Sequence, residues 1–227
     1  MRLSIVIPAL NAAKFLPQTL LALASTLDAD QRGGVEIIVA DGGSTDATSV
    51  IAEAAGALLV TAPRGRGNQL AAGAKVASGD WLLFLHADTR PRQGWHEETS
   101  RFTVAPENVM RAAYFRFALD TAARQARTLE RRVAWRARVL GLPYGDQGLL
   151  ISRKHYDAIG GYNAIPLMED VDLVRRVGRS RLCAIPVEFV TDASKFTGQW
   201  RLRSARNLLV LALYFLGAPP RFLRKIY

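Results

Sequence analysis

The fold is decided by the stretch Gly79-Asp80-Trp81-Leu82-Leu83-Phe84-Leu85-His86-Ala87-Asp88-Thr89. Its five apolar residues, 81–85, run without a polar break, which is typical of a strand buried on both faces of a parallel sheet. Asp88 follows the carboxyl end of this strand, where open α/β sheets bind ligands. Asp88 is therefore a candidate metal ligand beside a phosphorylated substrate. The alternative is an aspartate that only caps a turn.

Upstream of this strand, runs rich in β-branched residues alternate with segments of helical periodicity. Strands are expected at 3–7, 35–40 and 57–61. Helices are expected at 12–27, through 51–55 with Ser44 as N-cap, and at 69–77. Four strand–helix alternations of this kind predict an α/β fold with a doubly wound, mostly parallel sheet.

The pattern changes after Thr89. Helices are expected at 94–103 and 121–139, strands at 112–119 and 149–152, and a loop at 141–148. The helix at 121–139 carries six arginines against Glu130 alone, and such a charge run is usually a solvated face.

The composition is strongly basic. Lys and Arg number 30 against 20 Asp and Glu, which gives a net charge of +10, and 49% of the 227 residues are hydrophobic. The hydrophobic content excludes global disorder. The charge implies an anionic partner: nucleotide phosphates, nucleic acid or an acidic membrane surface. The single cysteine, Cys183, excludes an intrachain disulfide and a CxxC metal site, and we expect a buried core thiol.

The two ends of the chain differ in character. The first apolar run ends at Pro8, too soon for a signal peptide, so we read it as a strand and expect a cytoplasmic protein. From Ala193 to Tyr227 there is no acidic residue, and the apolar run 208–216 is too short to span a bilayer. We divide the chain into an α/β domain, 1–192, which carries the candidate site, and a helical basic segment, 193–227. That segment packs on the domain or contacts an anionic membrane peripherally.

A second carboxylate is expected at the same rim as Asp88. Asp41 ends the second strand, beside the first strand end at Pro8-Ala9-Leu10-Asn11, and could accept hydrogen bonds from a nucleobase imide or a ribose hydroxyl. The fingerprint GxGxxG is absent after the first strand, which argues against NAD or FAD. Arg64 and Arg66, in a loop after the third strand, could neutralise a diphosphate or could simply be solvated.

The third acidic site is Glu169-Asp170-Val171-Asp172, which opens a helix. Acids at a helix N-terminus are stabilised by the helix dipole, which is the structural explanation. The functional explanation is a general base that takes a proton from an acceptor hydroxyl.

Five motifs occur in an order that resembles the family 2 glycosyltransferases, over roughly residues 1–190. They are Ile5-Val6-Ile7-Pro8-Ala9-Leu10-Asn11, Asp41-Gly42-Gly43-Ser44-Thr45-Asp46, His86-Ala87-Asp88, Gly160-Gly161-Tyr162 and Glu169-Asp170-Val171-Asp172. Three stretches look closest to a small bacterial subgroup of arsenosugar-biosynthesis glycosyltransferases: Arg66-Gly67-Asn68-Gln69, His86-Ala87-Asp88-Thr89 and Tyr144-Gly145-Asp146-Gln147.

The resemblance implies a GT-A fold, a nucleotide-diphosphate sugar donor, a hydroxyl acceptor that the sequence does not identify, and Mn²⁺ or Mg²⁺. By position, Asp41 would meet the nucleobase, Arg66 the nucleotide and Asp88 the metal, with Asp170 as the base of an inverting transfer. The other residues grouped with the substrate site are Pro8, Asn11, Ser44, Gln69, His86, Asp146, Gln147 and Glu169. His86 stands where the family's metal motif usually has its first acid, a departure that Mn²⁺ tolerates better than Mg²⁺.

Two alternatives belong to other classes. A sugar nucleotidyltransferase would carry a glycine-rich basic loop after the first strand, but that loop reads Asn11-Ala12-Ala13-Lys14 and has no glycine. A non-enzymatic module that binds nucleic acid or membrane would explain the charge of +10 but would leave the rim acids without a role. We therefore expect a transferase and no nucleic-acid partner.

Overall fold

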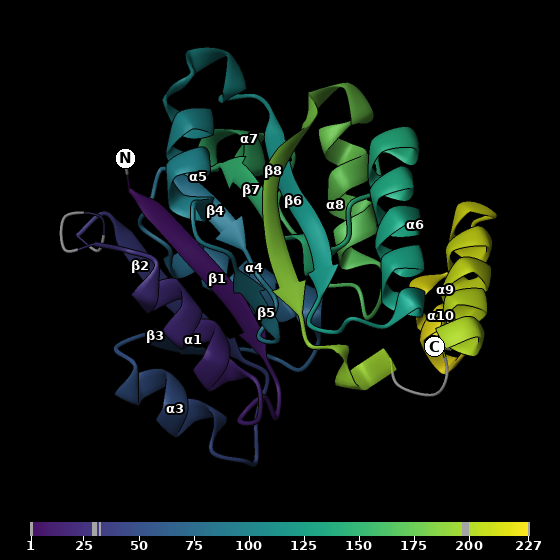
Figure 1. The fold of residues 1–227 in the computed structure, drawn as a ribbon, viewed down its shortest axis with the longest axis horizontal. Helices are drawn as coiled ribbons and strands as arrows, with labels where there is room; N and C mark the ends of the chain where they lie inside the picture. The colour runs from purple at the N-terminus through teal and green to yellow at the C-terminus, as the bar shows by residue number, and fades with distance from the viewer. Residues whose placement is uncertain (1, 29–30, 32, 197–199, 227) are drawn as a thin grey trace.

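The computed structural model describes residues 2–28, 31, 33–196 and 200–226. Its strands form one sheet in the order β3-β2-β1-β4-β7-β6-β8-β5 (Figure 1). The first four, β1 (Leu3–Ala9), β2 (Val35–Asp41), β3 (Leu58–Thr61) and β4 (Trp81–Phe84), pair in parallel. The predicted strand–helix alternation of the first half is thus confirmed. Strands β2 and β3 lie on one side of β1 and strand β4 lies on the other, so the strand order reverses between β1 and β4.

The second half of the sheet is mixed. Strand β7 (Leu149–Ser152) runs antiparallel between β4 and β6 (Ala112–Leu119), and β8 (Leu182–Thr191) runs parallel to β6. Strand β4 therefore has one parallel and one antiparallel neighbour, and the antiparallel pairs of the mostly parallel sheet lie in this second half. Strand β5 (Thr89–Pro91), antiparallel to β8 at the edge, is absent from the predicted elements. Cys183 in β8 packs against the core as expected of a core thiol but is only half-buried, which corrects the prediction of a buried one.

Helices cover both faces of the sheet because alternate strand residues point to opposite sides. Ile5 and Ile7 join the core under α1 (Leu16–Ser25), α3 (Thr48–Ala54) and α5 (Trp95–Val104). Val6 joins the core under α4 (Arg66–Val76), α7 (Arg153–Ala158) and α8 (Glu169–Val177). Helix α6 (Arg124–Leu140) packs on β6 through Val133 and its neighbours. Single helical turns complete the described chain: η1 (Pro106–Asn108), η2 (Gly145–Gln147), η3 (Arg179–Arg181) and η4 (Ala193–Phe196).

Three predicted helix starts are corrected. Helix α1 begins at Leu16, with Pro17 in its first turn, where a proline's missing N–H costs nothing. Helix α4 begins at Arg66, so this arginine belongs to the first helical turn and not to the preceding loop. Helix α3 begins at Thr48, and Ser44, three residues before its N-cap, does not cap it.

The packing of α4 on β1 positions the start of that helix. A Cβ atom added at Gly73 would lie 2.4 Å from Val6 Cγ1, so only a glycine lets the helix backbone approach the strand this closely. The N-terminus of α4 follows the carboxyl end of β3 and lies at the same rim as the ends of β1 and β2. This rim is the topological switch point of the sheet.

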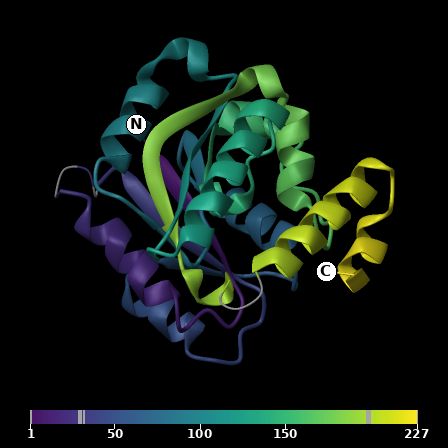
Figure 2. The same ribbon diagram turned by 45° about the vertical axis from the view of Figure 1, so that its right-hand side comes forward.

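The C-terminal helices α9 (Trp200–Phe215) and α10 (Pro220–Ile226) lie at the edge of the molecule beyond α6, far from α1 and α3 (Figures 1 and 2). Val210, Leu211 and Leu223 are buried in the core cluster that contains Val171 and Val174 of α8. Within the described parts of the chain, every helix falls short of the length and apolar character that crossing a bilayer requires.

Candidate active site

Two cavities meet at the switch point. The larger, of about 1070 Å³, opens over the end of β1 and the start of α4. The smaller, of about 240 Å³, lies between the start of α8, α6 and α9. Arg66, His86 and Asp88 line both cavities. The residues just past β4 thus stand at the junction of two spaces, one of which has the size of a small-molecule binding site.

The larger cavity is bordered by the loop after β1. Pro8 and Asn11 line it, and Asn11 has a positive φ of 50°. The Asn11 side-chain oxygen accepts a hydrogen bond from Thr45 N at 2.8 Å, and Asn11 N donates to Ser44 Oγ at 2.8 Å. The motifs after β1 and β2 therefore hold each other in place across this rim.

Asp41 orders its own loop. Its side chain is buried, and its carboxylate accepts hydrogen bonds from Gly43 N at 3.2 Å, Ser44 N at 3.0 Å and the Ser44 hydroxyl. Asp41 pairs with Ala9 at the end of β1, next to the cavity-lining Pro8, but does not itself line the larger cavity. Its contact with a nucleobase stays a prediction, whereas its support of the loop is observed.

Two predicted substrate residues, Gln69 and Gln147, use their side-chain amides to form hydrogen bonds with the protein backbone. Gln69 Nε2 donates to Ala9 O at 2.5 Å and to Ala40 O at 3.0 Å, and so clamps the ends of β1 and β2 at the wall of the larger cavity. Gln147 is 1% exposed and donates to Phe115 O at 3.2 Å. Gln147 lines neither cavity. Their observed role is to hold backbone, and a direct contact with substrate stays a prediction.

An ion pair joins the two helix starts. Arg66 Nη1 lies 3.1 Å from Glu169 Oε1, with the Arg66 side chain 45% exposed and that of Glu169 3%. Burial raises the pKa of Glu169, the adjacent Asp170 raises it further, and Arg66 opposes both. A buried acid thus fixes the position of Arg66, whose side chain stays partly exposed and lines both cavities.

Asp170 faces the smaller cavity together with Asp88. Its Oδ2 accepts a hydrogen bond from Gly145 N at 3.0 Å, and its Oδ1 accepts one from Val171 N at 2.8 Å. These two backbone donors fix the carboxylate at the start of α8. The structure therefore brings two of the three predicted acids, Asp88 and Asp170, to one cavity, and Asp41 to the adjoining rim.

Asp146 is the most perturbed acid in the smaller cavity. Its carboxylate is enclosed, although part of the residue reaches the surface, and burial raises its pKa to about 6. Arg136 opposes the rise, while Asp170 and Asp88 add to it. Among the residues that the structure describes, Asp146 Oδ1 has no hydrogen-bond partner. Arg136 itself stacks on Tyr144, with its guanidinium carbon 3.3 Å from the ring centroid.

Gly145 is held against His86. A Cβ atom at position 145 would lie 2.4 Å from His86 Nε2, so the imidazole packs directly on the η2 backbone that holds Asp170. The predicted Tyr144-Gly145-Asp146-Gln147 stretch thus connects the metal-motif position to the predicted base. The stretch therefore positions His86 and Asp170 relative to each other, and it requires glycine at position 145.

The carboxylates of the site could hold a divalent cation only together with ligands that the substrate supplies. Over residues 2–28, 31, 33–196 and 200–226, no group of three His, Cys, Asp or Glu side chains is arranged to hold a metal ion. Mg²⁺-type ions are, however, commonly held by one or two carboxylates together with substrate phosphates. Asp88, at the junction of the cavities, fits such a shared site.

Several cavity residues were not predicted from the sequence. Arg136 of α6 and Arg206 and Asn207 of α9 line the smaller cavity. Arg221 and Arg224 of α10 line the larger one. Their residue types suit anions and hydroxyls, but nothing in the sequence pattern indicates where α6, α9 and α10 dock.

Comparison with known proteins identifies the class. A family model described as glycosyl transferase family 2 matches residues 4–161, and the chain belongs to this family. A PGL/p-HBAD biosynthesis glycosyltransferase of Mycobacterium tuberculosis is 37% identical over 92 residues, which cover 37% of this chain and 34% of that protein. The chain thus matches about a third of the length of its curated relatives.

Solved structures show the same fold. TarS of S. aureus superimposes with a TM-score of 0.67 at 14% identity, over 93% of this chain and 39% of its own. Glucosyl-3-phosphoglycerate synthase of Mycobacterium tuberculosis, crystallised with Mn²⁺ and UDP-glucose, superimposes with a TM-score of 0.58 at 20% identity, over 82% of this chain and 69% of its own. The predicted GT-A type α/β fold is confirmed by these likenesses.

Proposed function

We propose that this protein transfers a sugar from a nucleoside-diphosphate donor to an acceptor hydroxyl, with inversion at the anomeric carbon. The observation that carries the proposal is the position of Asp88, which lines both cavities while Asp170 lines the smaller. The larger cavity suits the donor, and the smaller suits the acceptor. Membership in the family favours this reaction over nucleotidyl transfer or a purely binding role.

The donor side of the site is cationic. Arg64, Arg66, Arg221 and Arg224 line the larger cavity and offer guanidinium groups to a diphosphate. Neighbouring structures contain UDP-glucose in one protein and UDP-GlcNAc in another, so a UDP-sugar is the first donor to test. A divalent cation, held by Asp88 and the donor's own phosphates, would offset the charge that develops on the leaving diphosphate. Mn²⁺ suits the imidazole of His86 better than Mg²⁺ does.

The acceptor side combines apolar walls with enclosed polar atoms. Phe117, Leu129 and Val133 supply apolar surface. Asp146 Oδ1 and Asn207 Oδ1 are enclosed and have no hydrogen-bond partner among the described residues. Buried polar atoms of this kind are normally satisfied, and a hydroxyl-bearing acceptor would satisfy them.

In the proposed reaction Asp170 takes the proton from the acceptor hydroxyl. The acceptor oxygen then forms a bond to the anomeric carbon as the bond from that carbon to the diphosphate oxygen breaks. The backbone N–H groups of Gly145 and Val171, which donate to Asp170, hold its carboxylate in one orientation. The assignment to the arsenosugar-type subgroup, which rests on the three stretches noted above, and a cytoplasmic location are carried as parts of this proposal.

A thermal-shift screen tests the donor class. The full chain is mixed with UDP, GDP, ADP, CDP or dTDP, each with Mn²⁺ and with EDTA. A ligand at about a hundred times its Kd stabilises the native state by about 2.7 kcal/mol. For a chain of this length such a gain raises Tm by roughly 5–10 °C. We expect one base to give this shift with Mn²⁺ only. No shift with any diphosphate would contradict the proposal.

A further inference from the structure

Helix α9 presents an apolar face to solvent. Leu208, Leu209, Phe215 and the adjoining Leu216 are 68%, 52%, 50% and 82% exposed. With the exposed Ala205 and Ala212 they follow the spacing i, i+3, i+4, i+7, i+10 and i+11, which places them on one side of a helix. We call these six residues the α9 stripe. Soluble proteins seldom expose a contiguous apolar surface of this kind without a partner.

The stripe belongs to a docked helix. The opposite side of α9 contributes Val210 and Leu211 to the core cluster that holds Val171 and Val174 of α8. Arg206 and Asn207, also on that side, line the smaller cavity. Figure 2 shows α9 at the edge of the molecule, beside α6. The α9 stripe is therefore the outward face of a helix whose inner face packs on the core and lines the smaller cavity.

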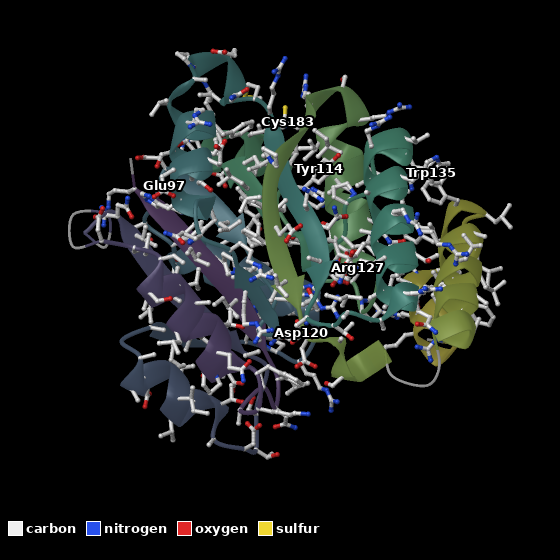
Figure 3. The ribbon with its side chains drawn as sticks, viewed as in Figure 1. Glu97, Tyr114, Asp120, Arg127, Trp135 and Cys183 are labelled. Carbon is white, nitrogen blue, oxygen red and sulfur yellow. The ribbon has the colours of Figure 1, made fainter. Side chains whose placement is uncertain are left out.

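The surroundings of the stripe are cationic. Residues 193–227 contain no acid. The guanidinium of Arg175 lies 5.0 Å from the Phe215 ring centroid, and the exposed Arg221 and Arg224 follow on α10. On α6, the exposed Arg131, Arg132 and Arg138 flank Trp135, which is 57% exposed and points away from the sheet on the side where α9 lies (Figure 3). Exposed apolar residues, an exposed tryptophan and surrounding arginines are typical of a protein surface that contacts a membrane interface.

We infer that the α9 stripe docks on an anionic membrane surface, with α9 lying in the plane of the interface. A second copy of the chain fits less well, because a symmetric contact would bring two such arginine-rich surfaces together. The lipid headgroup charge complements the arginines, and the acyl region receives the leucines and phenylalanine. The docking does not depend on the transfer reaction. Its consequence is that the smaller cavity, which α9 helps to line, is held close to the membrane.

Vesicle co-sedimentation of the full chain tests this inference. The vesicles contain phosphatidylcholine alone or with about one third phosphatidylglycerol. The test variant is Leu208→Gln with Leu216→Gln. The matched control is Leu21→Gln with Val104→Gln, because Leu21 and Val104 are 69% and 71% exposed on α1 and α5, away from the stripe. Arg221 and Arg224 are left intact because they also line the larger cavity.

We expect the wild type and the control to sediment with the anionic vesicles and the test variant to partition about tenfold more weakly. Raising NaCl to about 0.5 M should release part of the bound wild type. All three proteins should have similar Tm values and circular dichroism spectra. Three results would each overturn the inference: wild type that stays in the supernatant, equal loss of binding in both variants, or a lipid-free dimer that only the test variant dissociates.

Discussion

Arg66 Nη1 lies 3.1 Å from Glu169 Oε1, and this pair joins the first turn of α4 to the first turn of α8. Helix α4 belongs to the parallel half of the sheet, whereas α8 belongs to the mixed half. The pair therefore links the wall of the larger cavity to the helix that carries Asp170. Gly67, the next residue of α4, packs against the backbone oxygen of Asn163. The start of α4 is therefore in close contact with the loop that precedes α8.

A double-mutant cycle tests this link. Arg66→Met leaves a buried acid without its cation, and we expect a loss of about 1–2 kcal/mol in the free energy of unfolding. Glu169→Gln should cost less, because it removes the buried charge itself. The double variant should resemble Glu169→Gln, with a coupling above about 0.5 kcal/mol. Urea denaturation measures all four proteins, and strictly additive losses would show that the pair is not coupled.

Asp146 should make stability depend on pH. Its pKa is raised from 3.8 to about 6, so the folded protein holds this proton more tightly than the unfolded chain does. Ionisation therefore costs stability as pH rises from about 4 to about 6, and the full cost, on the order of 2–3 kcal/mol, persists above that range. In the metal-free protein we expect Asp146→Asn to raise Tm at pH 8 and to match the wild type at pH 4. Parallel Tm curves from pH 4 to pH 8 would contradict this.

The contact of Gly145 with His86 predicts a conditional cost. Gly145→Ala places a Cβ atom against His86 Nε2, and we expect a loss of about 1–3 kcal/mol from overpacking. In a His86→Ala background the clash is relieved, so the same glycine substitution should cost much less. Thermal denaturation of the four proteins measures this. An equal cost in both backgrounds would mean that His86 is not what excludes a side chain at position 145.

Asp170 should be needed for turnover and not for donor binding. Asp170→Asn removes the base and, because an amide has a single acceptor oxygen, keeps only one of the two backbone hydrogen bonds. Donor turnover should fall by about 10²–10⁴-fold. Asp172→Asn is the control, because Asp172 is on the same helix turn but pairs with Arg176 at 2.5 Å and does not line the cavity. Release of the nucleoside diphosphate measures turnover, and calorimetry measures binding. Near-normal turnover of Asp170→Asn would refute the assignment.

The first half of the fold could be predicted because its signals are local. Residues 81–85, and residues 3–7 apart from Ser4, are apolar runs long enough to define buried strands. The position of the acids after these strands follows from the parallel sheet. Strand β5 could not be predicted, since three residues that include Pro91 carry no periodicity and their partner β8 lies about a hundred positions away.

The approach of Asp88 and Asp170 to one cavity could be predicted because each motif directly follows a strand or opens a helix. Ser44 does not cap a helix because its hydroxyl donates to Asp41 within its own loop and accepts from Asn11 N, a residue that only the fold brings close. The same holds for Arg206 and Arg221. Charge alone cannot show whether an arginine faces solvent or a cavity until the docking of its helix is known.

The central claim is that Asp88 joins a divalent cation to the diphosphate of a sugar donor. The most direct measurement is calorimetric titration of UDP, or of the diphosphate that the thermal-shift screen selects, into the wild type, Asp88→Asn and the control Asp80→Asn, whose side chain is exposed beside β4. We predict binding by the wild type and the control with Mn²⁺ and not with EDTA, and at least about tenfold weaker binding by Asp88→Asn. Equal affinity in Mn²⁺ and EDTA, or unchanged affinity in Asp88→Asn, would contradict the claim.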